Sequence, residues 1–216
     1  MKMIFSILGV IGGLLCCVGD ILFDLKGAGN EKRGTSGQID TNWEKMAYWR
    51  FGVSILCAFA GDVLVGFGIY SFYLQIADTA PTLATVMLIC GYIGMIGGFF
   101  VHSMVCIQPV IYKSIMEKGS FEQADYTLEK FYKAITIPFF TAYLILMVVP
   151  VCQAVAILAG YMPVPKWCAL LNSIVFLMIG VAMRKIDPKR FQDLPGIIMP
   201  SLGLAMIGLV GIINLA

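Results

Sequence analysis

Residues 18–26 read Val-Gly-Asp-Ile-Leu-Phe-Asp-Leu-Lys and place two carboxylates inside the end of an otherwise apolar helix. Asp20 and Asp24 are four residues apart, so they lie on one face of that helix. An ionisable side chain at membrane depth is costly and usually faces a partner or a wet cavity, which makes it a functional-site hypothesis. We expect these carboxylates to line such a site, with Arg50 as the first candidate partner and Lys26 as the other basic neighbour of Asp24.

The composition is that of a polytopic membrane protein. Hydrophobic residues make up 59% of the chain, charged residues 13%, and the mean hydropathy is +0.87, whereas soluble proteins average roughly 45–50% apolar and about 25% charged residues. A helix needs about 20 apolar residues to cross the hydrocarbon layer. The sequence therefore predicts an all-α bundle, one domain over residues 1–216, with six spans at about 3–25, 50–73, 83–111, 134–161, 166–184 and 195–215.

The basic residues are distributed unequally between the two predicted sides of the membrane. Lys2 and Lys166 fall on one side, and the other thirteen of the fifteen Lys and Arg residues fall on the opposite side. The positive-inside rule then predicts cytoplasmic loops one, three and five and extracytoplasmic termini, in a bacterial inner (plasma) membrane. The net charge of +2 is too small to indicate nucleic acid as a partner, so membrane lipids are the expected surroundings.

Several polar residues in these spans are predicted to lie at similar distances from the cytoplasmic ends of their helices. At 1.5 Å per residue, Asp62, His102 and Asn172 lie about 15–18 Å from the cytoplasmic ends of their helices, and Asp20 lies about 9 Å from its end. The sequence predicts a polar track that opens to the cytoplasm. Its candidate binding residues are Asp20, Asp24, Trp49, Arg50, Asp62, His102, Gln108, Tyr112 and Asn172. The alternative is that each polar group is satisfied by its own neighbour: Asp62 by Asn172 or a serine, and His102 by a carbonyl.

His102 is the only histidine, which argues against a zinc hydrolase because such sites want three strong ligands. With Asp20 or Asp62 as orienting carboxylate, His102 would be an adequate general base. Ser103 points about 100° away on the helix and is a poor nucleophile for it. All seven cysteines fall inside predicted spans or at their edges without a Cys-x-x-Cys motif, so we expect packing residues. We expect no metal site and no cofactor.

Aromatic residues crowd the start of the second span at Trp43, Tyr48 and Trp49. Such residues normally form a belt at the headgroup level. The alternative is an amphipathic lid, with Trp43, Met46 and Trp49 on helical spacing, that closes the pocket around Asp20 and Asp24. A capping box is expected at Thr41 with Glu44, and another at Ser120 with Gln123, where it would start a short amphipathic cytoplasmic helix.

Small residues mark close helix contacts. Gly9 and Gly13 form a small-xxx-small face in the first span, which we interpret as an intramolecular seam rather than a dimer interface. The third span carries glycines at 91, 94, 97 and 98, which would let another backbone approach closely.

The motifs Gly19-Asp20-x-x-x-Asp24 and Trp43-x-x-Met46-x-x-Trp49-Arg50-Phe51, with one histidine in the third span, resemble an uncharacterised family of bacterial multi-span membrane proteins. This resemblance implies a six-span inner-membrane protein. It implies nothing about chemistry, because the family has no assigned activity.

The leading hypothesis is binding or transport of a lipid or small amphipathic molecule in a cytoplasm-facing polar pocket. One alternative is an intramembrane enzyme that modifies a lipid or isoprenoid, with His102 and Asp20 or Asp62 as the acid–base pair. A second is a structural subunit of a membrane complex, whose glycine faces would pack against partners.

Overall fold

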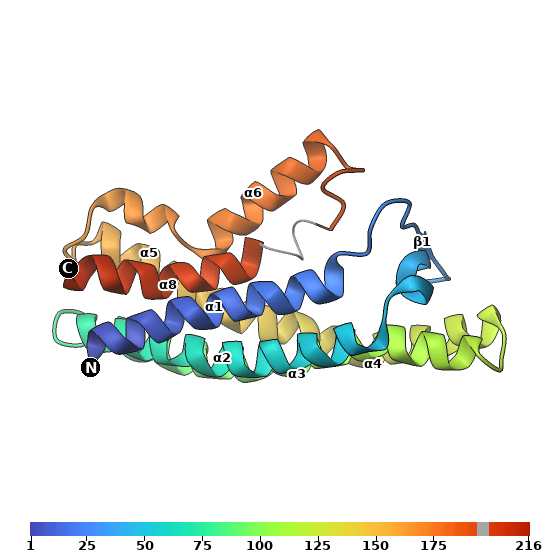
Figure 1. Ribbon diagram of the computed structural model, residues 1–216. Helices are drawn as coiled ribbons and strands as arrows, with labels where there is room; N and C mark the ends of the chain where they lie inside the picture. The colour runs from blue at the N-terminus through green and yellow to red at the C-terminus, as the bar shows by residue number, and fades with distance from the viewer. Residues whose placement is uncertain (194–198) are drawn as a thin grey trace.

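The computed structural model describes residues 1–193 and 199–216, and most of these residues are helical (Figure 1). The four longest helices are α1 (Lys2–Asp24), α2 (Tyr48–Ile76), α3 (Pro81–Met116) and α4 (Phe121–Leu146). The shorter elements are β1 (Lys32–Arg33), β2 (Ile39–Asp40), the 3-10 helix η1 (Thr41–Lys45), α5 (Val148–Leu158), the 3-10 helix η2 (Lys166–Leu170), α6 (Ser173–Ile186) and α8 (Met199–Leu215). Strands β1 and β2 pair antiparallel, with Lys32 opposite Asp40.

Four stretches are long and apolar enough to cross a membrane: Lys2–Asp24, Tyr48–Ile76, Pro81–Met116 and Phe121–Leu158. They overlap the first four predicted spans, although the first ends one residue and the fourth three residues before the predicted bound. Helix α8 is apolar but shorter, at 17 residues, and the first residues of the sixth predicted span lie outside the described residues. The protein is therefore helical, and four of its helical stretches have the length and hydrophobicity typical of a membrane protein.

The predicted span over 166–184 is not one continuous helix. Its first part is η2, and α6 begins only at Ser173 because Asn172 is extended and caps it: Oδ1 of Asn172 accepts hydrogen bonds from the backbone N–H groups of Ile174 and Val175. The 14 residues of α6 amount to about 21 Å, less than the roughly 30 Å hydrocarbon layer. A local side-chain cap thus divides what hydropathy alone predicts as a single helix.

The two capping predictions have different outcomes. At Ser120 the capping box is confirmed, since its hydroxyl accepts from the N–H of Gln123 while the Gln123 side chain accepts from the N–H of Ser120. The helix that it starts is not a separate amphipathic segment, because α4 continues without a break into the apolar stretch that ends at Leu158. At Thr41 the prediction is wrong: η1 has no side-chain cap, and Glu44 instead accepts a hydrogen bond from Tyr112.

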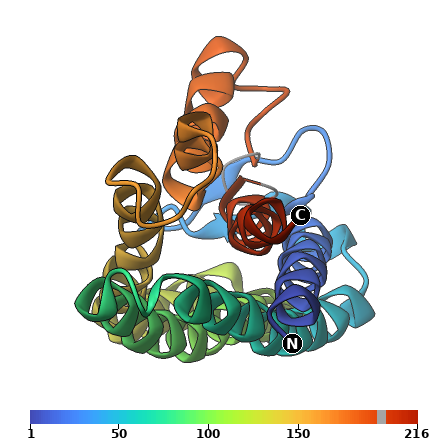
Figure 2. The same ribbon diagram turned by 90° about the vertical axis from the view of Figure 1, so that its left-hand side faces the viewer.

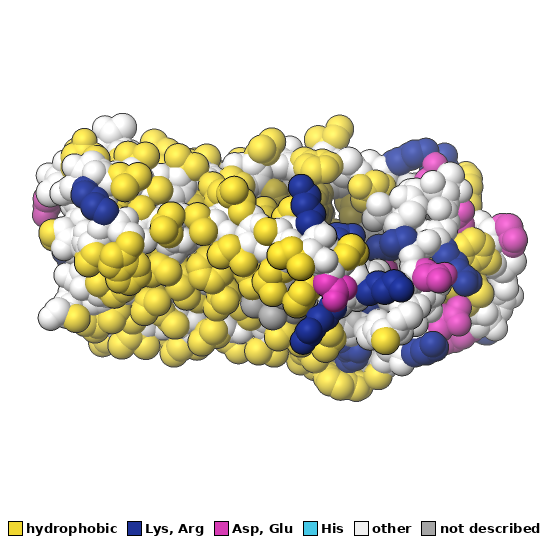
Figure 3. All heavy atoms as spheres, turned by 90° about the horizontal axis from the view of Figure 1, so that it is seen from above, with side chains coloured by type: hydrophobic (Ala, Val, Ile, Leu, Met, Phe, Trp, Pro, Cys, Tyr) yellow, Lys and Arg dark blue, Asp and Glu magenta, His cyan; other side chains and the backbone are white. Residues whose placement is uncertain are grey.

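Helices α1 to α4 follow one another in space, while α8 packs on α1 and α2 and α6 packs on α8 (Figure 2). Both termini lie at one end of the molecule (Figure 1). The face in Figure 3 is mostly hydrophobic, and most of its acidic and basic side chains lie toward the end opposite to the termini, where Figure 1 places β1 and the turn between α3 and α4. Figure 1 also shows α6 diverging from the bundle, with Met178 65% exposed and Ile186 82% exposed.

Glycines allow α1 to lie directly against two other helices. A Cβ atom at Gly9 would overlap the backbone of Gly68 in α2, and one at Gly13 would overlap the backbone of Ala205 in α8. In α3, a Cβ at Gly94 would crowd Leu146 of α4. The small-residue faces are therefore used inside the chain, which supports the intramolecular interpretation over assembly with partners.

The aromatic segment before α2 is split between core and surface. Trp43 and Met46 are buried, at 2% and 3% exposure, and pack in one hydrophobic cluster with Phe23, Phe51 and Tyr112. Trp49 is 61% exposed. The interfacial-belt interpretation therefore fits Trp49 but not Trp43, because the chain folds back over the end of α3 and buries the Trp43 ring against Tyr112.

Replacing Gly13 with Ala should lower the free energy of unfolding in detergent by about 1–3 kcal/mol, because α1 and α8 must separate to admit the methyl group. Thermal or chemical unfolding followed by circular dichroism measures the effect. Gly52→Ala is the control, since its Cβ would meet open space, and it should gain up to about 1 kcal/mol from helix propensity. Equal effects of the two substitutions would contradict the packing described above.

Candidate functional site

A cavity of about 410 Å³ lies between α1, α2, α3, α4, α6 and α8. Its wall is mostly apolar, with a few convergent polar groups, as is usual for sites that bind small molecules. It is lined by Cys16, Asp20, Phe23, Asp24, Ala58, Asp62, Met95, Gly98, Val101, His102, Val105, Phe139, Ala142, Tyr143, Leu146, Leu177, Pro200, Ser201 and Leu204.

Four of the predicted site residues meet in this cavity. Asp20 and Asp24 come from one face of α1, Asp62 from the middle of α2 and His102 from α3. Local helix geometry explains the first pair, because residues four apart on a helix are neighbours. The packing of α1 against α2, and of α2 against α3, brings the other two beside it.

Asp20 and His102 belong to a chain of polar contacts that crosses four helices. The Ser201 hydroxyl donates to Oδ2 of Asp20 at 2.5 Å, and Oδ1 of Asp20 lies 3.5 Å from Nδ1 of His102. On the other side of the ring, Nε2 of His102 lies 2.8 Å from Oγ of Ser54. The imidazole is thereby held between a carboxylate and a hydroxyl, an arrangement that fixes its orientation.

Ser54, His102 and Asp20 contact one another in the order of a catalytic triad: nucleophile, base and orienting carboxylate. In a triad the nucleophile faces the substrate, whereas here the Ser54 hydroxyl does not face the cavity. Ser54 is 0% exposed and lines neither of the cavities described here. Its hydroxyl also lies 2.7 Å from the carbonyl oxygen of Gly19, to which it donates. A substrate in the cavity reaches His102 and Asp20 but not this oxygen, so the arrangement suits proton transfer better than nucleophilic attack.

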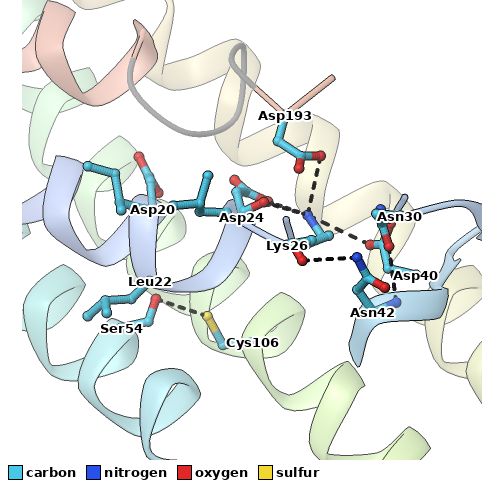
Figure 4. Close-up of polar contacts among 12 residues, drawn as sticks. Asp20, Leu22, Asp24, Lys26, Asn30, Asp40, Asn42, Ser54, Cys106 and Asp193 are labelled. Atoms are coloured by element: carbon cyan, nitrogen blue, oxygen red, sulfur yellow. Dashed lines mark hydrogen bonds and ion pairs between the residues drawn. The ribbon is translucent and has the colours of Figure 1, made fainter. Parts of the chain in front are cut away.

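Lys26 forms a junction between three segments of the chain (Figure 4). Its Nζ lies 3.1 Å from Asp24 at the end of α1, 3.7 Å from Asp40 in β2 and 3.7 Å from Asp193 after α6. Burial of this ammonium group opposes its charge, but the three carboxylates outweigh that effect and raise the pKa of Lys26 above its usual value. Asp24 is therefore paired with Lys26, one of its two predicted partners.

A second cavity, of about 250 Å³, adjoins the first at the charged end of the molecule. The two cavities share the wall residues Phe23, Asp24, Val105 and Phe139. Lys26, Asp40 and Gln108 line only the second one, as does Trp43, the aromatic residue expected in a lid. Polar side chains thus line both cavities, from Asp62 in the middle of α2 to Lys26 beyond the end of α1.

Arg50 is not part of either lining, and the prediction that it pairs with Asp20 or Asp24 is wrong. Its Nε donates to the carbonyl of Leu22 at 2.9 Å, and its Nη2 donates to the carbonyl of Leu25 at 2.7 Å. The last carbonyls of a helix have no intrahelical partner and carry partial negative charge. Arg50 therefore caps α1, which satisfies its guanidinium without a carboxylate.

The remaining predicted site residues lie apart from the first cavity. Tyr112 is buried and donates to Glu44 at 2.7 Å, and Asn172 is the helix cap described above. Trp49 is exposed and lines neither cavity, whereas Gln108 belongs to the second one. The expected pairing of Asp62 with Asn172 is absent from the described contacts, since Asn172 bonds to the backbone of its own segment.

Sequence reasoning missed Ser54, Ser201, Tyr143 and Asp193. Ser54 had a usable signal, because it is a polar residue inside the apolar second span. Ser201 and Asp193 are distant in sequence from α1 and carried none. Within residues 1–193 and 199–216, no group of three or more His, Cys, Asp or Glu side chains is arranged to hold a metal ion.

The whole chain, residues 1–216, matches the model of a family described as a family of unknown function (DUF6796). This finding agrees with the resemblance to an uncharacterised family. Neither a curated protein nor a solved structure matches the chain.

Replacing Arg50 with Ala should lower the free energy of unfolding by about 1–3 kcal/mol, because it removes charge-assisted hydrogen bonds to the end of α1. Unfolding in detergent measures this loss. Arg184→Ala, at an exposed position, is the matched control and should have almost no effect. If Arg50→Ala were as stable as Arg184→Ala, the capping role would be excluded.

Proposed function

Because the chain belongs to DUF6796, a family of unknown function, we propose its activity from the cavity alone: it binds or transports a lipid or small amphipathic molecule. The single observation that carries this proposal is the cavity of about 410 Å³ with an apolar wall and a polar cluster of Asp20, Asp62 and His102. Ligand sites have volumes of about 300–1,000 Å³ and this mixture of lining groups. An amphipathic molecule matches both parts of the wall.

The position of these polar groups supports the proposal. Each ionisable side chain in a membrane span costs ~2.5–3.5 kcal/mol on insertion scales, so such groups tend to mark binding sites and ion pathways. Three carboxylates and one imidazole line a single cavity within the apolar part of the bundle. The neighbouring cavity with Lys26 and Gln108 supplies the polar route toward the charged end.

The topology that we propose has six membrane crossings, with extracytoplasmic termini and the basic end in the cytoplasm of a bacterium. Helices α1, α2, α3 and the α4–α5 stretch would be four crossings, and η2 with α6 and then α8 would be the shorter fifth and sixth. Short spans are accommodated by local thinning of the bilayer. The position of both termini at the end opposite to the charged one supports this orientation (Figures 1 and 3).

A second candidate function is an enzyme that uses His102 and Asp20 as an acid–base pair on a lipid or isoprenoid. The supporting observation is the 3.5 Å separation between Nδ1 of His102 and Oδ1 of Asp20, with both residues in the cavity wall. General acid–base catalysis needs a base whose orientation is fixed and whose protons can reach the substrate.

Replacing Gly98 with Leu should abolish ligand binding without unfolding the protein. A Cβ at Gly98 meets nothing within 4 Å, and the residue lines the cavity, so the added side chain fills space that the ligand would occupy. Native mass spectrometry of protein reconstituted in a total lipid extract should show at least about tenfold fewer bound-lipid adducts. Gly52→Leu, also in open space but outside the cavity, should keep them. Equal adducts in the two variants would refute the binding site.

For the enzyme, His102→Gln should reduce product formation about 10²–10⁴-fold, the usual contribution of a general base. The assay is mass spectrometry of vesicles of phospholipid and isoprenoid phosphate after incubation with the protein. Ser103→Ala is the control, because Ser103 is adjacent but its hydroxyl donates to Phe99 of its own helix. Absence of any product from the unmodified protein would leave binding as the function.

A further inference from the structure

We propose that the molecule held in the cavity beside Asp20, Asp62 and His102 carries a positive charge on its polar end, as a long-chain amine or quaternary ammonium compound does. This inference rests on the proposed binding function and specifies its ligand class. It follows from a comparison of the partners of the three carboxylates that line the cavity.

Asp24 and Asp20 already have partners. Asp24 forms an ion pair with Lys26 at 3.1 Å. Asp20 accepts a hydrogen bond from Ser201 and lies beside His102. Each of these carboxylates is oriented by the protein itself, and Asp24 is neutralised by it.

Within residues 1–193 and 199–216, Asp62 has no such partner. It is the central residue of the 29-residue helix α2, and the thiol of Cys16 at 3.5 Å is its one polar contact within the described part of the chain. A thiol is a weak hydrogen-bond donor. A carboxylate in the middle of an apolar helix is therefore left without a cation or a strong donor, and it faces the cavity.

The charges of the other residues in the cavity wall disfavour a ligand with a negatively charged head group. Among the described residues that line this cavity there is no Lys or Arg, whereas there are three Asp residues. An anionic head group would be repelled by Asp20 and Asp62, the two of these carboxylates that are not paired with Lys26, because repulsion between like charges is strong in a medium of low dielectric constant. A cation would be attracted by the same groups, and the cavity is also lined by the aromatic residues Phe139 and Tyr143, a residue type whose ring face attracts cations.

The wall also favours an organic cation over a metal ion. The described acidic and histidine side chains form no metal-holding group of three or more, although several line the same cavity. Most of the lining surface is hydrocarbon or aromatic, which suits an ammonium group on an alkyl chain. The volume of about 410 Å³ is far larger than a single ion requires.

The experiment compares three probes with the same alkyl chain on the purified full-length protein in a mild detergent: dodecyltrimethylammonium, dodecyl phosphate and a neutral dodecyl polyethylene glycol ether. The measurement is the increase in thermal unfolding temperature against probe concentration. The quaternary ammonium group keeps its charge at every pH, so the probe itself does not titrate. We expect the cation to act at about tenfold lower concentration than the neutral probe, and the anion to be the weakest.

Asp62→Asn should remove the preference for the cation while the neutral probe still binds, and Asp62→Glu should retain it. Asp78→Asn is the matched control, because Asp78 is exposed in the turn between α2 and α3, and it should behave like the unmodified protein. Equal action of the three probes, or a preference that survives in Asp62→Asn, would overturn the cationic ligand class and leave amphiphile binding intact. If no probe stabilised the unmodified protein more than Gly98→Leu, the binding function itself would fail, and the ligand class with it.

Discussion

The close approach of α1 to α2 and α8 is the contact on which the site depends. Because Gly9 and Gly13 have no side chains, the three backbones lie against one another over the first half of α1. Toward the other end of α1 the residues on this side become larger and polar, and the helices enclose a cavity beside Asp20. Helix α8 runs antiparallel to α1, so Ala205 lies against Gly13 and Ser201 reaches Asp20. The packing of α1 against α2 and α8 is therefore tight at Gly9 and Gly13 and leaves a cavity beside Asp20.

Charge balance changes along the polar track. At the charged end, Lys26 is surrounded by the carboxylates of Asp24, Asp40 and Asp193, which hold the end of α1, the β1–β2 segment and the chain after α6 together (Figure 4). Deeper in the bundle, Asp62 faces the cavity with a thiol as its described partner. Buried carboxylates without cations are unfavourable in a protein of low dielectric constant, so the interior end is where an external cation gains most.

Interatomic distances alone would suggest a different function. Ser54, His102 and Asp20 form a sequence of contacts that a search for hydrolase geometry would select. The burial of Ser54, and its hydrogen bond to the carbonyl of Gly19, remove it from any substrate in the cavity. Access therefore decides between the chemical interpretations: the groups that a bound molecule touches are carboxylates, an imidazole and aromatic rings.

The sequence by itself determined what depends on local geometry and composition: apolar helices of spanning length, Asp20 and Asp24 on one helix face, the cap at Ser120, and the positions of Asp62 and His102 inside long apolar helices. Each follows from a fixed rise and turn per residue, or from hydrogen bonds within four residues. The tertiary structure alone decided that Arg50 caps α1, that Ser201 reaches Asp20 and that Asp193 reaches Lys26. The cap at Asn172 is a local contact that the hydropathy pattern did not reveal. Depth along a helix is set by residue count, but the side to which a residue points is set by how helices rotate against one another, and that depends on packing between distant segments.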